Sequence, residues 1–227
     1  MNDFQWIKNH FDSRQNQSWN RLKDIIPPIF DDYFLVHWKV GIVKNFPFDD
    51  YPEDNFSIEN INKRVKIDRE FNLFLNPEKD QLFEEVSLNY LSKRFNVPKN
   101  ENILSNIKDT PAIEILTKQS QVAIKNSLEK IAKNQDLYFY IEDIFRLEAF
   151  NVTQQEYSRY KISEYIKFQE SIRYDFNTYL FTKNLDWCLT TSEDLPMFLC
   201  TKKNVTEKMK KQFDLELIKV DYDKIIN

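Results

Sequence analysis

The sequence predicts an α+β protein in which a mostly helical N-terminal half packs on a largely antiparallel C-terminal sheet. Two observations support this class. Apolar residues recur every three or four positions in several segments of the first 135 residues, as on the buried face of a helix. Short apolar or alternating runs then follow one another between residues 178 and 221, which is typical of antiparallel strands. We therefore expect one α+β domain over residues 1–227, with a mainly helical part (1–135) and a sheet-rich part (136–227) as the alternative division.

Prolines and capping residues set the limits of the expected helices. An apolar stripe over residues 3–25 predicts one or two helices that end at the proline pair 27–28. A second helix is expected over residues 77–95, because an asparagine cap precedes its first proline. The same logic predicts a longer helix over 110–133, and a capping box at 153–156 predicts another that runs toward Tyr174.

The strands are predicted from apolar runs between turn residues. Residues 29–43 are β-rich and predict one or two strands, followed by an acidic loop. The continuous run 137–141 predicts a central strand that is covered on both faces. Strands dominate the C-terminal part, with one helix over 205–213; the expected strands are 178–182, 186–191, 197–201 and 215–221.

The two cysteines belong to one expected hairpin. If its turn centres on Asp194, Cys188 lies opposite Cys200 and Leu189 lies opposite Leu199. A cross-strand disulfide would fit this geometry. We expect free thiols instead, because the N-terminus lacks the pattern of a signal peptide and a reducing cytoplasm is the default compartment.

Composition excludes several classes of protein. The chain has one glycine, Gly41, whereas phosphate-binding loops, dinucleotide fingerprints and nucleophile elbows need several. Two histidines and two cysteines are too few for a zinc site with the usual spacing. No uncharged apolar stretch is long enough to cross a membrane. We therefore expect no metal, no cofactor and no membrane span.

The charge argues against general duplex binding. The formal net charge is −4, from 32 basic and 36 acidic residues. Residues 202–211 nevertheless contain five lysines against one glutamate, so a regulator that contacts nucleic acid through this segment remains a third alternative.

The segment 46–56 carries the main functional hypothesis. Acidic residues and asparagines alternate there with four aromatic residues, and two prolines restrict the backbone. Aromatic anchors with a charged rim are typical of protein interfaces, although an acidic surface loop with inward-facing aromatics is the plain alternative. The expected partner-binding residues are Phe48, Asp49, Asp50, Tyr51, Glu53 and Asp54.

A second hypothesis places an enzyme site at the C-terminal hairpin. Asp186, Glu193 and Asp194 would supply carboxylates for a hydrolase or transferase. The indole of Trp187 would stack on a planar or sugar substrate.

Two blocks of sequence resemble a known group of proteins. Residues 25–33 (Ile-Ile-Pro-Pro-Ile-Phe-Asp-Asp-Tyr) resemble the Leu-Pro-Pro-x-Phe opening of a group of uncharacterised bacterial cytoplasmic proteins. Residues 185–194 (Leu-Asp-Trp-Cys-Leu-Thr-Thr-Ser-Glu-Asp) resemble the Trp-Cys hairpin of that group, although Ser192 replaces an aspartate and glycines are missing after the hairpin. The resemblance implies a cytoplasmic, immunity-type protein with no established activity.

Together these observations favour a protein without catalytic activity that binds another protein. The specific expectation is an immunity protein that neutralises a cognate bacterial toxin, with the carboxylate-dependent enzyme as the alternative. The oligomeric state is left open.

Overall fold

The computed structural model describes residues 3–12, 21–37, 40–52, 57–71, 83–100, 102–104, 106–107, 113–114, 118–133, 135–142, 156–172, 176–192 and 197–223. The chain divides into two compact units. Unit 1 comprises Met1–His37 and Ala123–Asn227, and unit 2 comprises Trp38–Val122. Unit 2 is thus inserted between two parts of unit 1, a division that differs from a boundary at residue 135.

Unit 1 is built on a seven-stranded antiparallel sheet with the order β10-β1-β9-β8-β7-β5-β6. Its strands are β1 (Asp32–His37), β5 (Leu137–Ile141), β6 (Glu156–Tyr160), β7 (Thr178–Thr182), β8 (Trp187–Thr191), β9 (Phe198–Thr201) and β10 (Glu216–Lys219). The sheet and its helices confirm the predicted α+β class. The four expected C-terminal strands are confirmed as β7 to β10.

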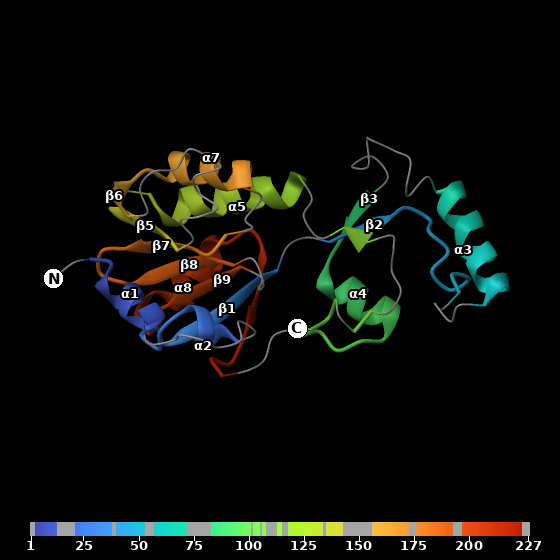
Figure 1. Ribbon diagram of the computed structural model, residues 1–227, viewed down its shortest axis with the longest axis horizontal. Helices are drawn as coiled ribbons and strands as arrows, with labels where there is room; N and C mark the ends of the chain where they lie inside the picture. The colour runs from blue at the N-terminus through green and yellow to red at the C-terminus, as the bar shows by residue number, and fades with distance from the viewer. Residues whose placement is uncertain are drawn as a thin grey trace. The chain divides into compact units, whose positions relative to one another are not determined.

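Helices cover both faces of this sheet (Figure 1). On one face lie α1 (Gln5–Asp12) and α2 (Leu22–Ile25), and on the other lie α5 (Lys118–Ile131), α7 (Ile162–Ile172) and α8 (Lys203–Gln212). Phe4, directly before α1, packs on Tyr138, with ring centroids 5.9 Å apart, and Tyr165 of α7 packs on Phe139 at 5.2 Å. Since adjacent residues of β5 point to opposite faces, these two contacts place α1 and α7 on opposite sides.

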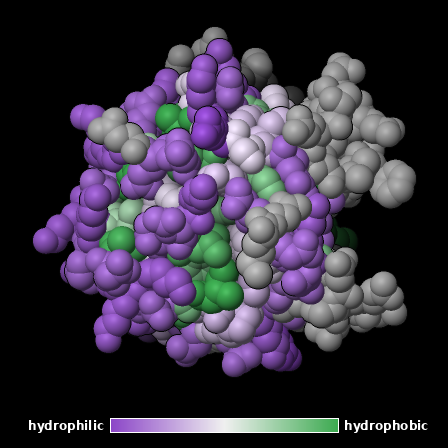
Figure 2. Space-filling view, turned by 90° about the vertical axis from the view of Figure 1, so that its left-hand side faces the viewer, coloured by the Kyte–Doolittle hydropathy of each residue, from purple (hydrophilic) through white to green (hydrophobic). Residues whose placement is uncertain are grey.

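The hydrophobic core of unit 1 lies on both faces of its seven-stranded sheet. Figure 2 shows the side on which α1 and β6 lie, where hydrophobic residues surface in patches between hydrophilic ones. Among the described helices, none combines the length and the apolar character that a membrane span requires.

The predicted register of the hairpin is confirmed. Cys188 lies opposite Cys200, and Leu189 lies opposite Leu199. Both cysteines are fully buried and free, as expected, within the core cluster that α1 and α2 cover.

Unit 2 is smaller and contains a three-stranded antiparallel sheet with the order β3-β2-β4. Its strands are β2 (Val40–Val43), β3 (Phe83–Val86) and β4 (Ile113–Glu114), and its helices are α3 (Ile58–Glu70) and α4 (Leu88–Phe95). A small cluster of Val43, Phe46 and Ile67 forms a hydrophobic core. The β-rich segment 29–43 therefore gives two strands, of which β1 belongs to unit 1 and β2 to unit 2.

Three predicted helices begin later than expected. In the segment 77–95, residues 83–86 form β3 and the helix α4 starts at Leu88, where the hydroxyl of Ser87 accepts a hydrogen bond from the Tyr90 amide at 3.2 Å. The prediction of a continuous helix was wrong here because pairing with β2 satisfies the backbone of residues 83–86. The proposed Asn76 cap lies outside the described residues.

In the segment 110–133, where one helix was expected, residues 113–114 form the strand β4 instead. Ile113 pairs with Ile42 in the small sheet, and α5 begins at Lys118. Over its remaining length the predicted helix is confirmed, and α5 buries one face with Ser127, Leu128 and Ile131. Residues 110–112 lie outside the described residues.

The third correction concerns residues 153–174. Glu156–Tyr160 form β6, which pairs with β5, and α7 covers only Ile162–Ile172. Residues 153–155 of the expected capping box lie outside the described residues. The strand β5 is buried along its whole length, as predicted, but it lies next to the edge strand β6 rather than at the centre of the sheet.

Candidate functional site

The acidic turn, residues 47–52, follows β2 in unit 2. Asn45 takes a left-handed conformation (φ 58°) and turns the chain out of the strand. The amides of Asp50 and Tyr51 then both donate to the carbonyl of Pro47 at 3.0 Å. These short-range bonds hold the backbone of the turn in one compact conformation.

The aromatic side chains of this segment pack inward. Phe46 is buried, and its ring centroid lies 4.8 Å from that of Phe48, 5.2 Å from Tyr51 and 5.2 Å from Phe71. Phe48 and Tyr51 remain partly exposed at the edge of this cluster. The two expected anchors thus help to form the core of unit 2, and a partner would reach only part of each ring.

Asp49 is held by Arg94 of α4. The guanidinium donates to both carboxylate oxygens, with distances of 2.9 and 2.8 Å, which is the two-bond geometry preferred by this pair. The same guanidinium lies 6.0 Å from the Phe48 ring and 5.9 Å from the Phe95 ring. The hydrogen bonds from Arg94 lower the pKa of Asp49, so this exposed carboxylate stays charged.

A second polar contact fastens the end of the turn to α3. The Tyr51 hydroxyl donates to the buried carboxylate of Asp68 at 3.1 Å, and the Arg64 guanidinium lies 4.9 Å from the Tyr51 ring centroid. Burial raises the pKa of Asp68, against the opposing effects of Tyr51 and Arg64. The acidic turn is therefore tied to α4 through Asp49 and to α3 through Tyr51.

Of the six expected partner-binding residues, the structure describes four. Asp49 and Asp50 are exposed, whereas Phe48 and Tyr51 are partly buried. Glu53 and Asp54 lie outside the described residues. The acidic turn thus presents two neighbouring carboxylates on a fixed backbone.

At the alternative enzyme site, the C-terminal hairpin, the side chain of Trp187 is buried. Trp187 is only 1% exposed, and its indole nitrogen donates to Gln135 Oε1 at 3.0 Å, so the prediction that it stacks on a substrate was wrong. The Asp186 amide donates to the Thr182 hydroxyl at 3.0 Å, which fixes the start of β8. Glu193 and Asp194 lie outside the described residues.

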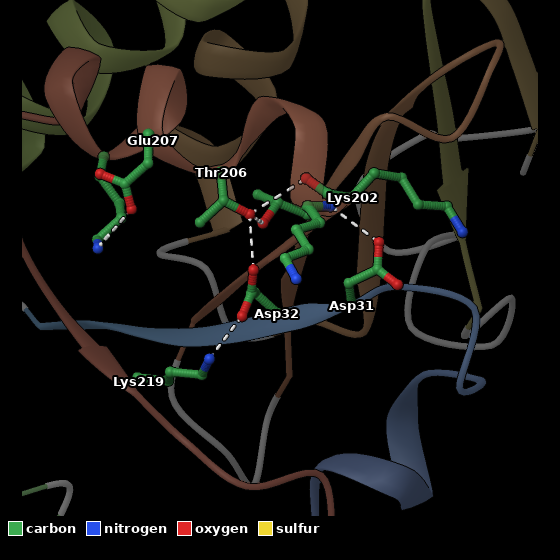
Figure 3. A network of polar contacts seen from close by, with 9 residues as sticks. Asp31, Asp32, Lys202, Thr206, Glu207 and Lys219 are labelled. Atoms are coloured by element: carbon green, nitrogen blue, oxygen red, sulfur yellow. Dashed lines mark hydrogen bonds and ion pairs between the residues drawn. The ribbon is translucent and has the colours of Figure 1, made fainter.

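A polar network joins β1, α8 and β10 (Figure 3). Asp32 accepts hydrogen bonds from Lys219 Nζ at 2.6 Å and from the Thr206 hydroxyl at 2.8 Å. These bonds lower the pKa of Asp32, with the Lys219 bond as the largest cause. Asp31 accepts a bond from the Lys203 amide at 2.8 Å and thereby caps α8 from outside the helix.

This network gives part of the basic segment 202–211 a structural role. Lys202 Nζ donates to the carbonyl of Ile29, and Lys210 pairs with Glu207 at 3.0 Å. Both lysines also lie near aromatic rings, at 6.0 Å from Phe30 and 5.7 Å from Phe34 respectively. Two of the five lysines are thus engaged within unit 1.

An exposed apolar stripe on α3 was not predicted from the sequence. Ile58, Ile61 and Val65 lie three and four positions apart, so they share one helix face, and all three are exposed. This spacing is visible in the sequence, but it is equally typical of a buried helix face. Exposure, which the sequence does not reveal, distinguishes the two.

The described residues contain no group of three or more histidine, cysteine, aspartate or glutamate side chains that could hold a metal ion.

Comparisons of the chain with family models, with curated proteins and with solved structures found no match in any of the three.

Proposed function

We propose that this protein binds another protein through unit 2 and acts without catalysis of its own. The observation that carries the proposal is the distribution of exposed apolar side chains. The large hydrophobic residues that are exposed in the described part of the chain lie in unit 2 or at its boundary. Ile58, Ile61, Val65 and Tyr90 lie within it, and Val122 is its last residue, in the helix α5 that continues into unit 1. Clustered exposed apolar residues reduce solubility and are a feature of interaction surfaces.

The acidic turn supports the same proposal. Its backbone is held by local hydrogen bonds, and the bonds of Asp49 and Tyr51 to Arg94 and Asp68 hold its side chains. A partner that binds a prearranged surface loses less conformational entropy than one that must order a loop. The exposed carboxylates of Asp49 and Asp50 would also accelerate the approach of a basic partner.

The specific form of the proposal is an immunity-type protein that covers the active surface of a bacterial toxin in the cytoplasm. A toxin that acts on nucleic acid or another polyanion needs a basic surface, and an acidic turn is complementary to it. The resemblance of residues 25–33 and 185–194 to cytoplasmic bacterial proteins of immunity type points in the same direction.

Affinity purification from the native host, at low and at high salt, tests the proposal. We expect one stoichiometric partner, identified by mass spectrometry as a toxin encoded beside this protein, and weaker capture at high salt. Changing Asp49 and Asp50 to Asn preserves their shape but removes two charges, so association should slow by about tenfold.

The matched control changes Glu129 and Glu170, two exposed residues of unit 1, to Gln. It alters the net charge equally and should leave association unchanged. Absence of any partner at either salt concentration would refute the proposed function. Equal slowing by both double variants would show an effect of net charge rather than of the acidic turn.

A further inference from the structure

The apolar stripe of α3 is defined here as Ile58, Ile61 and Val65, which are 79%, 43% and 40% exposed. The three residues span two turns of one helix face. Among the described large hydrophobic residues, Ile58 is the most exposed. The stripe is therefore an apolar strip along the surface rather than a single exposed side chain.

Ile67 holds α3 on unit 2, because it is buried in the core cluster on the side of the helix opposite Val65. Asp68, three residues after Val65, is buried at the edge of the stripe and bonded to Tyr51. The N-terminus is capped by the Ser57 hydroxyl, which accepts from the Asn60 amide at 3.1 Å. Since these contacts position the helix, the apolar stripe is available for another molecule.

The charged residues next to the stripe indicate the sign of the charge that the bound molecule carries. Arg69 lies four residues after Val65 and continues the row toward the C-terminus of α3. Lys66 lies three residues before Arg69 on the adjoining exposed face, and both side chains are exposed. The positive charges of Lys66 and Arg69 thus border the C-terminal half of the stripe, where the carboxylate of Asp68 is buried and bonded to Tyr51. The exposed carboxylates of Glu59 and Glu70 lie farther around the helix from Val65.

We propose that the apolar stripe of α3 docks an amphipathic helix of the partner protein whose apolar face is bordered by acidic residues. Packing of two helices would bury the stripe, and the acidic border would pair with Lys66 and Arg69. The inference rests on the proposed protein-binding function, but it concerns a surface other than the acidic turn. It specifies the chemistry of the partner's segment that binds to α3.

Two synthetic helical peptides test this proposal. Both carry a row of leucines at helical spacing, and they differ only in having glutamates or lysines on either side of that row. We expect the glutamate peptide to bind, measured by fluorescence anisotropy, and to shift the amide NMR signals of α3. The lysine peptide should bind at least about tenfold more weakly.

Variants of α3 then locate the site. Changing Ile61 and Val65 to Ser should weaken binding of the glutamate peptide by about tenfold or more, because apolar area is no longer buried. Changing Lys66 and Arg69 to Glu should reverse the preference, so that the lysine peptide binds better. The control Val122→Ser changes an exposed apolar residue of α5, outside the stripe, and should bind as the parent does.

Circular dichroism and thermal melting check that each variant is folded, which we expect because the changed side chains are exposed. The proposal is overturned if neither peptide binds, if both bind equally, or if the shifted amides lie away from α3. Binding to vesicles of anionic phospholipid that the Ile61 and Val65 changes abolish would also overturn it, in favour of a membrane. If the peptide experiments contradict docking on α3 but the affinity purification yields a stoichiometric toxin, the proposed function stands and the interface lies elsewhere.

Discussion

At the scale of single residues, the scarcity of glycine shapes the backbone. In the part of the chain that the structure describes, four other residues occupy left-handed conformations: Asn45, Asn96, Arg159 and Leu185, with φ of 58°, 52°, 56° and 54°. Asparagine tolerates this region well, whereas the other two residue types lose stability there. The single glycine serves a different purpose, because a Cβ atom at Gly41 would lie 3.0 Å from the Phe83 Cβ. It permits the close approach of β2 and β3.

The change Gly41→Ala should therefore destabilise unit 2. The added methyl group must push Phe83 aside, at a cost of about 1–3 kcal/mol in the free energy of unfolding. Denaturant titration would measure the loss, and hydrogen exchange should show faster exchange in β2 and β3. Glu84→Ala, at an exposed position of β3, controls for the general effect of an alanine in this sheet. Equal stability of the two variants would contradict the steric explanation.

At the scale of elements, side chains from distant segments secure the ends of helices. Asp31 caps α8 across 172 residues of sequence, and Asp32 links β1 to both α8 and β10. The acidic pair was visible in the sequence, but its partners were not. In α4, by contrast, the cap is local, since Ser87 begins the helix and the left-handed Asn96 ends it.

The stability contributed by Asp32 should depend on pH. Because Lys219 and Thr206 lower the pKa of Asp32 in the folded state, its contribution is complete above the unfolded pKa of about 4 and is lost as the pH falls through the folded pKa. Asp32→Asn keeps the shape and should cost about 1 kcal/mol at neutral pH.

Unfolding titrations of the parent and of Asp32→Asn at several pH values measure this effect. The difference between them should shrink below about pH 4, where the unfolded parent chain takes up a proton that folded Asp32 binds only at lower pH. Lys219→Met, which removes the same ion pair from its other side, should show the same trend. A difference that is constant from neutral to acidic pH would rule out the charge of Asp32 as its cause.

At the scale of the whole molecule, the N-terminal strand β1 closes the sheet of unit 1. It lies between β9 and β10, although more than 150 residues separate it from them in sequence. Cys188 and Cys200 lie within this sheet, on the two strands β8 and β9, and are 0% exposed. Burial raises the pKa of both thiols, so neither is a nucleophile in the folded protein.

Thiol labelling should therefore report the opening of unit 1. We expect both cysteines to resist a disulfide reagent such as Ellman's in the native protein and to react at once in denaturant. With rising denaturant, the labelling rate should follow the population of unfolded unit 1. Cys188→Ser should halve the amount of thiol released without making Cys200 accessible. Rapid labelling of the native protein would show that this part of the sheet opens locally.

Much of unit 1 could be predicted from the sequence because its C-terminal strands alternate with short turns. The pairing of Cys188 with Cys200 followed from counting residues across one turn. The helices that were expected to start at residues 77 and 110 were misplaced for the same reason. Each segment carries residues compatible with a helix, but pairing with the distant strand β2 determines its structure.

The candidate site could be predicted only in part. The acidic turn was identified from its composition, and the exposure of Asp49 and Asp50 agrees with a binding role. The engagement of Asp49 by Arg94 and of Tyr51 by Asp68 could not be foreseen, because both partners lie on helices further along the chain. For the same reason the sequence suggested a substrate contact for Trp187, whose side chain is buried.

The sequence by itself determined the α+β class, the C-terminal hairpin and the position of an acidic turn rich in aromatic residues. These features depend on local periodicity, turn residues and composition, which act over a few neighbouring positions. Only the tertiary structure decided that β1 joins the C-terminal sheet, that residues 38–122 form a separate unit and that the stripe on α3 faces solvent. Strand partners and burial depend on contacts between distant segments, and a local pattern is the same whether its apolar face is covered or exposed.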